Sequence, residues 1–213
     1  MSLTPPDKTD PDAGLVQRAQ AGELAAFEEL VTRYERQVYT LARRITGHDH
    51  DAEDVTQQAF SSAIDHLASF RAEASFKTWL LRITANAALK IVRKRKGQPT
   101  LSLEAQTEPQ EGYDTVPHPE IIADWRQSPD ELVEKQETMQ MIEAALEELD
   151  EKHRLVFLLR DVQGLSIEET SVALGISPAN VKVRLLRARL QLREKLTLAF
   201  GDLEHRFEPH RHE

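Results

Sequence analysis

The sequence contains no cysteine, so disulfide bonds and thiolate-bound metal sites are excluded. Long apolar runs are missing too, since none approaches the roughly 18–20 residues of a membrane-spanning helix. The chain also lacks an opening basic segment followed by an apolar one, which is the pattern of a secretory leader. These absences predict a protein with no membrane span that works in the reducing cytoplasm.

Basic residues are in the minority. Of the 213 residues, 36 are acidic and 27 are Lys or Arg, which gives a formal net charge of −9 at pH 7. A DNA-binding domain normally carries a basic footprint, so this total argues against one. Net charge is an average over the whole chain, however, and the distribution of the charges decides what a surface binds.

Apolar residues recur at three- and four-residue spacing through the first half of the chain, which is typical of helices with one buried face. This spacing predicts four helices, over residues 15–21, 24–47, 48–70 and 76–98. In the last of them we expect an inward-facing stripe of Phe76, Trp79, Leu80, Ile83, Ala87 and Ile91. The pattern predicts a helical domain over residues 14–96, preceded by a disordered tail over residues 1–13.

Residues 97–127 change in character. They show no helical period, contain four prolines, and carry six acidic residues against one arginine, a net charge of 1 − 6 = −5. This composition predicts an acidic flexible linker. Beyond it, helical patterns resume with a Ser-Pro-Asp-Glu start and predict a second helical domain over residues 128–198, followed by a histidine-bearing tail over residues 199–213. We therefore expect an all-α fold with two small helical domains.

The stretch LSIEETSVALGISPANVKVRLLRARLQLR, residues 165–193, predicts a helix-turn-helix motif. Ser166 and Glu169 have the spacing of a capping box at the start of the first helix. Gly175 can adopt the positive φ that a tight turn requires. Ser177 followed by proline is a favoured start for the second helix, because the first helical position needs no N–H.

The second helix of this motif has two different faces. Its inward stripe is expected to consist of Val181, Leu185, Ala188, Leu192 and Leu196. The opposite side mixes basic and aliphatic residues: Lys182, Val183, Arg184, Leu186, Arg187, Arg189, Leu190 and Arg193. Arginine forks onto guanine and aliphatic tips contact thymine methyl groups, so this face suits the DNA major groove. An ordinary amphipathic helix with a solvated basic face is the alternative, and the capped motif as a whole favours DNA binding.

Two other charged groups have competing interpretations. The basic run 93–96 ends a predicted helix, where cations are favourable in any protein, and phosphate contact is the second interpretation. His48, His50 and Asp51 contain metal-ligand types, but they are adjacent in sequence rather than on one helical face, which favours a solvated helix start. We expect no bound metal and no cofactor.

The two domains in this order resemble the extracytoplasmic-function (ECF) sigma factors, small subunits of bacterial RNA polymerase. The resemblance is carried by four segments: AFEELVTRYERQVYTLARRITG, DAEDVTQQAF, SFRAEASFKTWLLRITANAALKIVRKRK and LEELDEKHRLVFLLRDVQGLSIEETSVALGISPANVKVRLLRARLQLR. It implies a sigma factor that binds core RNA polymerase and directs promoter-specific transcription initiation through the −35 and −10 elements.

The resemblance also implies roles for individual positions. Docking on the coiled coil of the polymerase's largest subunit falls to Asp54, Gln57, Gln58 and Phe60. Capture and melting of the −10 element fall to Phe70, Arg71, Trp79, Arg82, Asn86, Arg93 and Lys94. Reading of the −35 element falls to Lys182, Val183, Arg184, Leu186, Arg187 and Arg189. The expected partners are core RNA polymerase, double-stranded and melted promoter DNA, and an anti-sigma factor, although no residue identifies the last.

Two other classes of function are alternatives. A stand-alone helix-turn-helix transcription regulator would use its N-terminal domain to sense a ligand or to dimerise, and the melting pattern over residues 70–96 argues against it. An enzyme is not expected, because the sequence contains no glycine-rich phosphate loop, no nucleophile motif and no paired catalytic residues.

Overall fold

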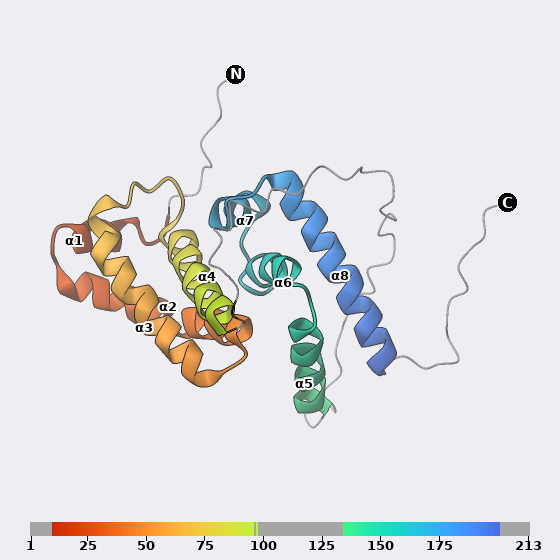
Figure 1. The fold of residues 1–213 in the computed structure, drawn as a ribbon. Coiled ribbons are helices and arrows are strands. Elements are labelled where there is room, and N and C mark those ends of the chain that lie inside the picture. The colour runs from red at the N-terminus through yellow and green to blue at the C-terminus, as the bar shows by residue number, and fades with distance from the viewer. Residues whose placement is uncertain (1–9, 96, 98–133, 201–213) are drawn as a thin grey trace, which may run out of the picture.

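The computed structural model describes residues 10–95, Gly97 and residues 134–200. All regular elements in these residues are helices, which confirms the predicted all-α fold (Figure 1). The predicted linker from residue 98 onward, the start of the second domain at Ser128, and the outer parts of both tails lie outside the described residues.

The N-terminal domain is built from helices that contact one another in pairs. In chain order they are α1 (Ala13–Gln20), α2 (Leu24–Thr46), α3 (Asp49–His66), the 3₁₀ turn η1 (Leu67–Ser69) and α4 (Phe76–Arg95). Helix α2 ends as predicted at Gly47, whose φ of 76° is left-handed and whose N–H donates to the Arg43 carbonyl at 2.9 Å. The predicted third helix is shorter than expected because its last residues tighten into η1.

The C-terminal domain contains α5 (Glu134–Glu147), α6 (Glu151–Phe157), a π-helical turn η4 (Leu158–Val162), α7 (Ile167–Leu174) and α8 (Pro178–Phe200). The single helix predicted around residues 152–162 therefore widens into a π turn at Leu158. Helix α8 contacts α5, α6 and α7. Helices α6 and α7 lie between α8 and helix α4 of the N-terminal domain (Figure 1).

Apolar side chains from both domains form one continuous hydrophobic core. Ile45 on α2 and Leu89 on α4 belong to the same buried cluster as Leu155 on α6 and Leu174 on α7, and all four are at most 2% exposed. A second cluster lies wholly inside the N-terminal domain, around Phe76. The sequence predicted two domains connected by a linker, and the structure adds that they are packed against each other.

Polar contacts reinforce this interface at both of its ends. Near the start of α4, Lys77 Nζ donates to the Gln163 carbonyl at 2.9 Å. Near its end, Arg93 Nη2 lies 2.7 Å from Glu151 Oε1, and only 8% of the Arg93 side chain is exposed. These contacts hold α4 against the turn before α7 and against the start of α6.

Arg154 adds a buried contact between the domains. It lies on α6, yet its Nη2 donates to the Ile45 carbonyl near the end of α2 at 3.1 Å. Burial lowers the pKa of the Arg154 guanidinium from its usual value. A cation so placed is costly to leave without a partner, so this contact favours the packed arrangement.

Helix α4 differs from its predicted orientation. Of the expected inward stripe, Phe76 and Leu80 are fully buried, whereas Trp79, Ile83, Ala87 and Ile91 are only half-buried. The face that is most deeply buried contains Leu81, Ala85, Ala88, Leu89 and Val92. The reason is that α4 packs against α2 and α3 within its own domain and also against α7 of the other, so its buried surface is wider than one stripe.

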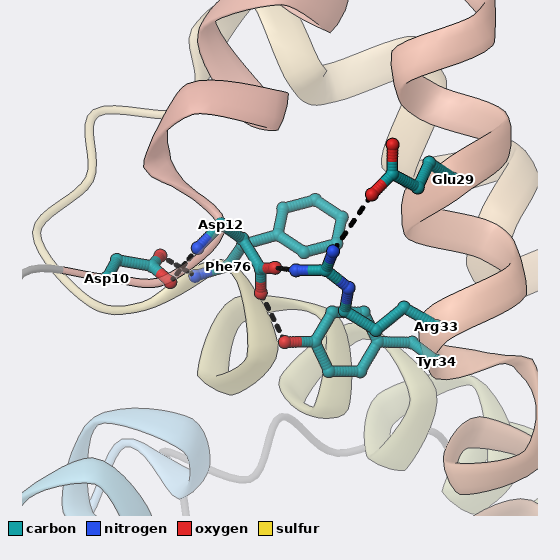
Figure 2. A network of polar contacts seen from close by, with 6 residues as sticks. All are labelled: Asp10, Asp12, Glu29, Arg33, Tyr34 and Phe76. Carbon is teal, nitrogen blue, oxygen red and sulfur yellow. Dashed lines mark hydrogen bonds and ion pairs between the residues drawn. The ribbon is translucent and has the colours of Figure 1, made fainter.

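The predicted disordered tail over residues 1–13 is corrected for its last residues. Asp12 is completely buried, and its carboxylate accepts hydrogen bonds from the Arg33 guanidinium and the Tyr34 hydroxyl (Figure 2). Asp10 accepts a hydrogen bond from the Phe76 N–H at 2.8 Å, at the first residue of α4. Polar composition suggested a tail, but these two carboxylates have partners on distant helices.

The helix-turn-helix forms as the sequence predicts. Ser166 Oγ accepts from the Glu169 N–H at 3.0 Å while a Glu169 carboxylate oxygen accepts from the Ser166 N–H at 2.7 Å, which is the complete capping box. Gly175 ends α7 with a left-handed φ of 65°. Ser177 Oγ then accepts from the Asn180 N–H at 3.2 Å at the start of α8.

The capping carboxylate makes a pH-dependent contribution to stability. Burial alone would raise the pKa of the Glu169 carboxyl, but hydrogen bonds from Ser166 and Thr78 outweigh it and lower that pKa from its usual value. A lowered folded-state pKa means that the ionised carboxylate stabilises the fold above the unfolded pKa of about 4.3. The contribution is lost as the pH falls through the folded-state pKa.

Glu169→Gln should therefore lower the free energy of unfolding at pH 7 but not in acid. Glutamine still accepts the Ser166 N–H, so we expect the loss of only the charge at the helix start, about 0.3–1 kcal/mol. Urea unfolding at pH 7 and at about pH 3.5 measures the difference. Glu194→Gln on α8, an exposed acid far from any helix start, is the control. A deficit for Glu169→Gln that is equal at both pH values would contradict this assignment.

Candidate nucleic-acid interface

Helix α8 presents the first candidate surface. Four residues of its predicted inward stripe, Val181, Leu185, Ala188 and Leu192, are at most 7% exposed, and the fifth, Leu196, is half-buried. Among the predicted −35 residues, Lys182 is exposed, and the side chains of Val183, Leu186 and Arg187 are half-buried. These groups lie on the side of α8 away from the stripe, which leaves an aliphatic and basic surface of the kind that a major groove accepts.

Arg184 does not lie on that surface. Only 3% of it is exposed, so its predicted outward position is wrong. It stands three residues after Val181 and four before Ala188, which places it on the inward side of a helix of 3.6 residues per turn. Arg184 was predicted to flank the outward face, and in the structure it is turned toward the core instead.

Arg189 is exposed but already has a partner. Its Nε and Nη2 donate to the two carboxylate oxygens of Asp161, each at 2.8 Å, and this pairing raises the pKa of the Arg189 guanidinium. An exposed ion pair of this kind contributes only about 0–1 kcal/mol. Arg189 could therefore leave Asp161 and bind a DNA phosphate or base at little cost in free energy.

The second candidate surface is a groove of about 1060 Å³ between α3 and α4. It brings together Asp54 and Gln57, predicted to dock on polymerase, with Trp79, Asn86 and Lys94, predicted to act on the −10 element. Gln58 also lines it and donates to Ser62 Oγ at 3.1 Å. Phe60 does not line the groove, because its ring packs against the inner core of the N-terminal domain.

A smaller cavity of about 240 Å³ lies at the loop between η1 and α4. It is lined by four of the predicted −10 residues, Phe70, Arg71, Trp79 and Arg82. The rings of Phe70 and Trp79 are 4.9 Å apart between centroids, so they form one aromatic wall. Val172 of α7 closes part of the same cavity, which places the C-terminal domain beside the predicted −10 site.

The basic run at the end of α4 is divided among different tasks. Arg93 is 7% exposed and is paired with Glu151 of the other domain, so its predicted DNA contact does not fit this arrangement. Arg95 contacts Asp51 and the Thr46 carbonyl, each at 3.1 Å. Only Lys94 faces the groove, and Lys96 lies outside the described residues.

Lys90 was not among the predicted site residues. It is exposed and lines the groove between Asn86 and Lys94. These three residues are four positions apart, so they lie on one face of α4. Their spacing alone could have grouped them. Together they form a row along α4 that consists of the Asn86 amide and the two cations Lys90 and Lys94.

The comparisons with known proteins agree with this geometry. The family model for Sigma-70 region 2 matches residues 30–98, which span α2 to α4. The model for Sigma-70 region 4 matches residues 139–192, which include the helix-turn-helix. Across the residues that the structure describes, no helix is both long and apolar enough to cross a membrane.

Two relatives match along almost their whole length. The ECF RNA polymerase sigma factor SigW of Bacillus subtilis is 33% identical over 181 residues, covering 85% of this chain and 94% of the relative. The ECF RNA polymerase sigma-E factor of Escherichia coli is 32% identical over 186 residues, covering 87% and 94%.

Solved structures show the same fold. The structure of CnrH in complex with the cytosolic domain of CnrY superposes with a TM-score of 0.64 at 25% identity, covering 89% of this chain and 99% of CnrH. The sigma factor RpoE of Bartonella quintana, solved in complex with the anti-sigma factor NepR, gives a TM-score of 0.58 at 24% identity, covering 81% and 97%.

A stand-alone regulator would not carry both regions in this order, so that alternative is set aside. The chain belongs to the ECF RNA polymerase sigma factors, and it directs promoter-specific transcription initiation by core RNA polymerase.

Proposed function

We propose that this sigma factor holds promoter DNA at two separate points while α3 docks on the coiled coil of the polymerase's largest subunit. The outward face of α8 would read the −35 element. The loop over residues 70–75, called the capture loop below, would hold a base flipped from the −10 element together with α4. The observation that carries this proposal is the groove between α3 and α4, where predicted docking and −10 residues line opposite sides.

The small cavity suits a flipped base. Extruding a base costs a few kcal/mol of stacking, and stacking on an aromatic side chain returns about 1–3 kcal/mol per base. Trp79 lines both the cavity and the groove, and Arg71 and Arg82 supply positive charge at the cavity. Asn86, Lys90 and Lys94 continue along α4 and would contact the unpaired strand.

This two-point contact requires the domains to separate. Elements centred at −10 and −35 are about 25 base pairs apart, which is roughly 85 Å of duplex at 3.4 Å per base pair. In the packed arrangement, Thr78 at the predicted −10 site donates to Glu169 of α7 at 3.4 Å. Helix α7 has 8 residues and leads directly into α8, so the two sites are within roughly 30 Å at 1.5 Å per residue.

The acidic composition fits this scheme. With a net charge of −9, the free protein repels DNA on average, although 12 of its 27 Lys and Arg residues lie on α4 and α8. We infer that polymerase supplies most of the affinity for the duplex and that the basic faces act once both domains are held open. The chain itself would carry no catalytic step, and it would act in the cytoplasm, where polymerase and promoters are.

We further propose that an anti-sigma protein regulates this chain. Two similar structures support this, because RpoE was solved with an anti-sigma factor and CnrH with the cytosolic domain of CnrY. A protein that stabilises the packed arrangement would keep the two DNA sites too close together for a promoter.

Arg187→Ala should relax promoter specificity at one base position of the −35 element. Loss of a forked arginine–guanine contact is expected to cost about 1–3 kcal/mol at that position and little elsewhere. Transcription from a set of singly substituted −35 elements measures it. Arg36→Ala, an exposed arginine on α2 outside both candidate surfaces, is the control. An equal loss on every promoter would instead identify Arg187 as a phosphate contact.

Asp54→Ala combined with Gln57→Ala should weaken binding to core polymerase. Both side chains are exposed on the groove side of α3, so the fold should be unaffected, and we expect a loss of about 1 kcal/mol or more, at least roughly fivefold. Glu53→Ala, on an adjacent face of α3, serves as the control. Unchanged polymerase affinity for the double variant, measured by titration, would show that docking is elsewhere.

A further inference from the structure

Both ends of the capture loop are tied to the N-terminal segment of the chain. At the start of the loop, Gln20 Nε2 on α1 donates to the Leu67 carbonyl at 2.9 Å and to the Phe70 carbonyl at 3.0 Å. At its end, Asp10 Oδ2 accepts from the Phe76 N–H at 2.8 Å (Figure 2). Residues more than 45 positions away therefore fix the main chain on either side of the loop.

Asp10 is itself held in place by a buried neighbour. Its Oδ1 accepts from the Asp12 N–H at 3.1 Å, and Asp12 is completely buried. The Asp12 carboxylate is bound by Arg33 and Tyr34 of α2, and Arg33 also contacts Glu29 at 2.9 Å (Figure 2). The Asp12 carboxylate raises the pKa of the Arg33 guanidinium, and burial together with the same carboxylate raises the pKa of the Tyr34 hydroxyl. These contacts hold Asp12, and through it Asp10, in one position against α2.

The residue that Asp10 holds is the centre of the aromatic wall. The Phe76 ring is completely buried and lies 5.9 Å from Tyr34, 6.2 Å from Phe70 and 5.8 Å from Trp79 between centroids. A shift of the Phe76 main chain would move this ring and with it Phe70 and Trp79, which line the small cavity. The hydrogen bond at the Phe76 N–H also adds a carboxylate at the start of α4, where negative charge is favourable.

The loop between these anchors contains a strained residue. Ala72 has a φ of 55°, which is a left-handed conformation that non-glycine residues rarely adopt. Such a conformation persists when the surrounding structure determines the path of the chain. The contacts of Gln20 and Asp10 determine it here from the two sides.

We propose that Asp10, Asp12 and Gln20, the N-terminal clamp, are positioning residues that hold the capture loop in the shape required to receive a flipped −10 base. This inference rests on the proposed role of the loop. The clamp contacts main-chain atoms that flank the loop, and none of its three residues lines the groove or the small cavity. Its effect would therefore be on the shape of the cavity, with no direct contact to DNA.

The test compares Asp10→Ala, Asp10→Asn and Gln20→Met with matched controls. Asparagine keeps an oxygen acceptor for the Phe76 N–H, so Asp10→Asn should restore most of what Asp10→Ala loses. Gln17→Met, one turn earlier on α1 and exposed, is the control for Gln20, and the exposed Glu35→Ala on α2 is the control for removal of an acid. Gln20 is exposed, so its variant keeps the test valid if Asp10→Ala fails to fold.

The readout is base discrimination at the −10 element by the full chain bound to core polymerase. The rate of open-complex formation is measured on the preferred promoter and on promoters with the captured base replaced. Asp10→Ala and Gln20→Met should each reduce the ratio of these rates about fivefold, the size of effect that one net hydrogen bond supports. Polymerase affinity and −35 discrimination should be unchanged. Hydrogen exchange at residues 70–76 should rise in both variants and stay at the wild-type rate in both controls.

Two outcomes separate this inference from the function on which it rests. If Trp79→Ala and Arg71→Ala reduce −10 discrimination but Asp10→Ala and Gln20→Met leave it intact, the clamp proposal is overturned and the capture loop stands. If Trp79→Ala and Arg71→Ala also leave discrimination intact, the loop does not capture the base and both proposals fail. An equal loss on all promoters, including one that is already melted at −10, would reduce the clamp to a general stabilising element and overturn it as well.

Discussion

Burial of α4 from two sides is the constraint on which the rest of the structure depends. One side packs into the N-terminal domain and another against α7, while a third borders the groove. Leu81, Ala85 and Leu89 join the core that continues into the C-terminal domain. Because the apolar surface of α4 is shared in this way, the helix that is proposed to act on the −10 element also holds the two domains together.

Much of the fold follows from local sequence signals. Ser166, Gly175 and the inward stripe of α8 behaved as predicted, because caps, turns and 3.6-residue spacing depend on nearby residues. The orientation of α4 was predicted wrongly. Spacing identifies the apolar residues of a helix, but it does not reveal that a second domain covers another face of the same helix. Arg93 and Arg184 were predicted to contact DNA and are buried instead. Partners that are distant in sequence also explain why the ordered Asp10 and Asp12 were taken for a tail.

The sequence predicted most of the residues of the candidate site but not how they are arranged in space. The capture loop, the groove and α8 contain most of the predicted side chains, but the sequence could not reveal that Asp54 and Asn86 border one groove or that Val172 closes the small cavity. It also could not reveal that a sigma factor of net charge −9 has its two predicted DNA sites within roughly 30 Å of each other. This proximity suits a resting state in which promoter binding is disfavoured. The interdomain contacts of Arg93 and Arg154 would determine how stable that resting state is.

The most direct test of this account is the distance between the two domains before and after promoter binding. Since the chain has no cysteine, spin labels can be attached to single cysteines introduced at the exposed residues Glu35 on α2 and Gln191 on α8. Pulsed electron resonance should find one distance in the free protein and a clearly longer one in the polymerase–promoter complex, because the two promoter elements are roughly 85 Å apart along the duplex. The same distance in both states would contradict the claim that the packed domains must separate.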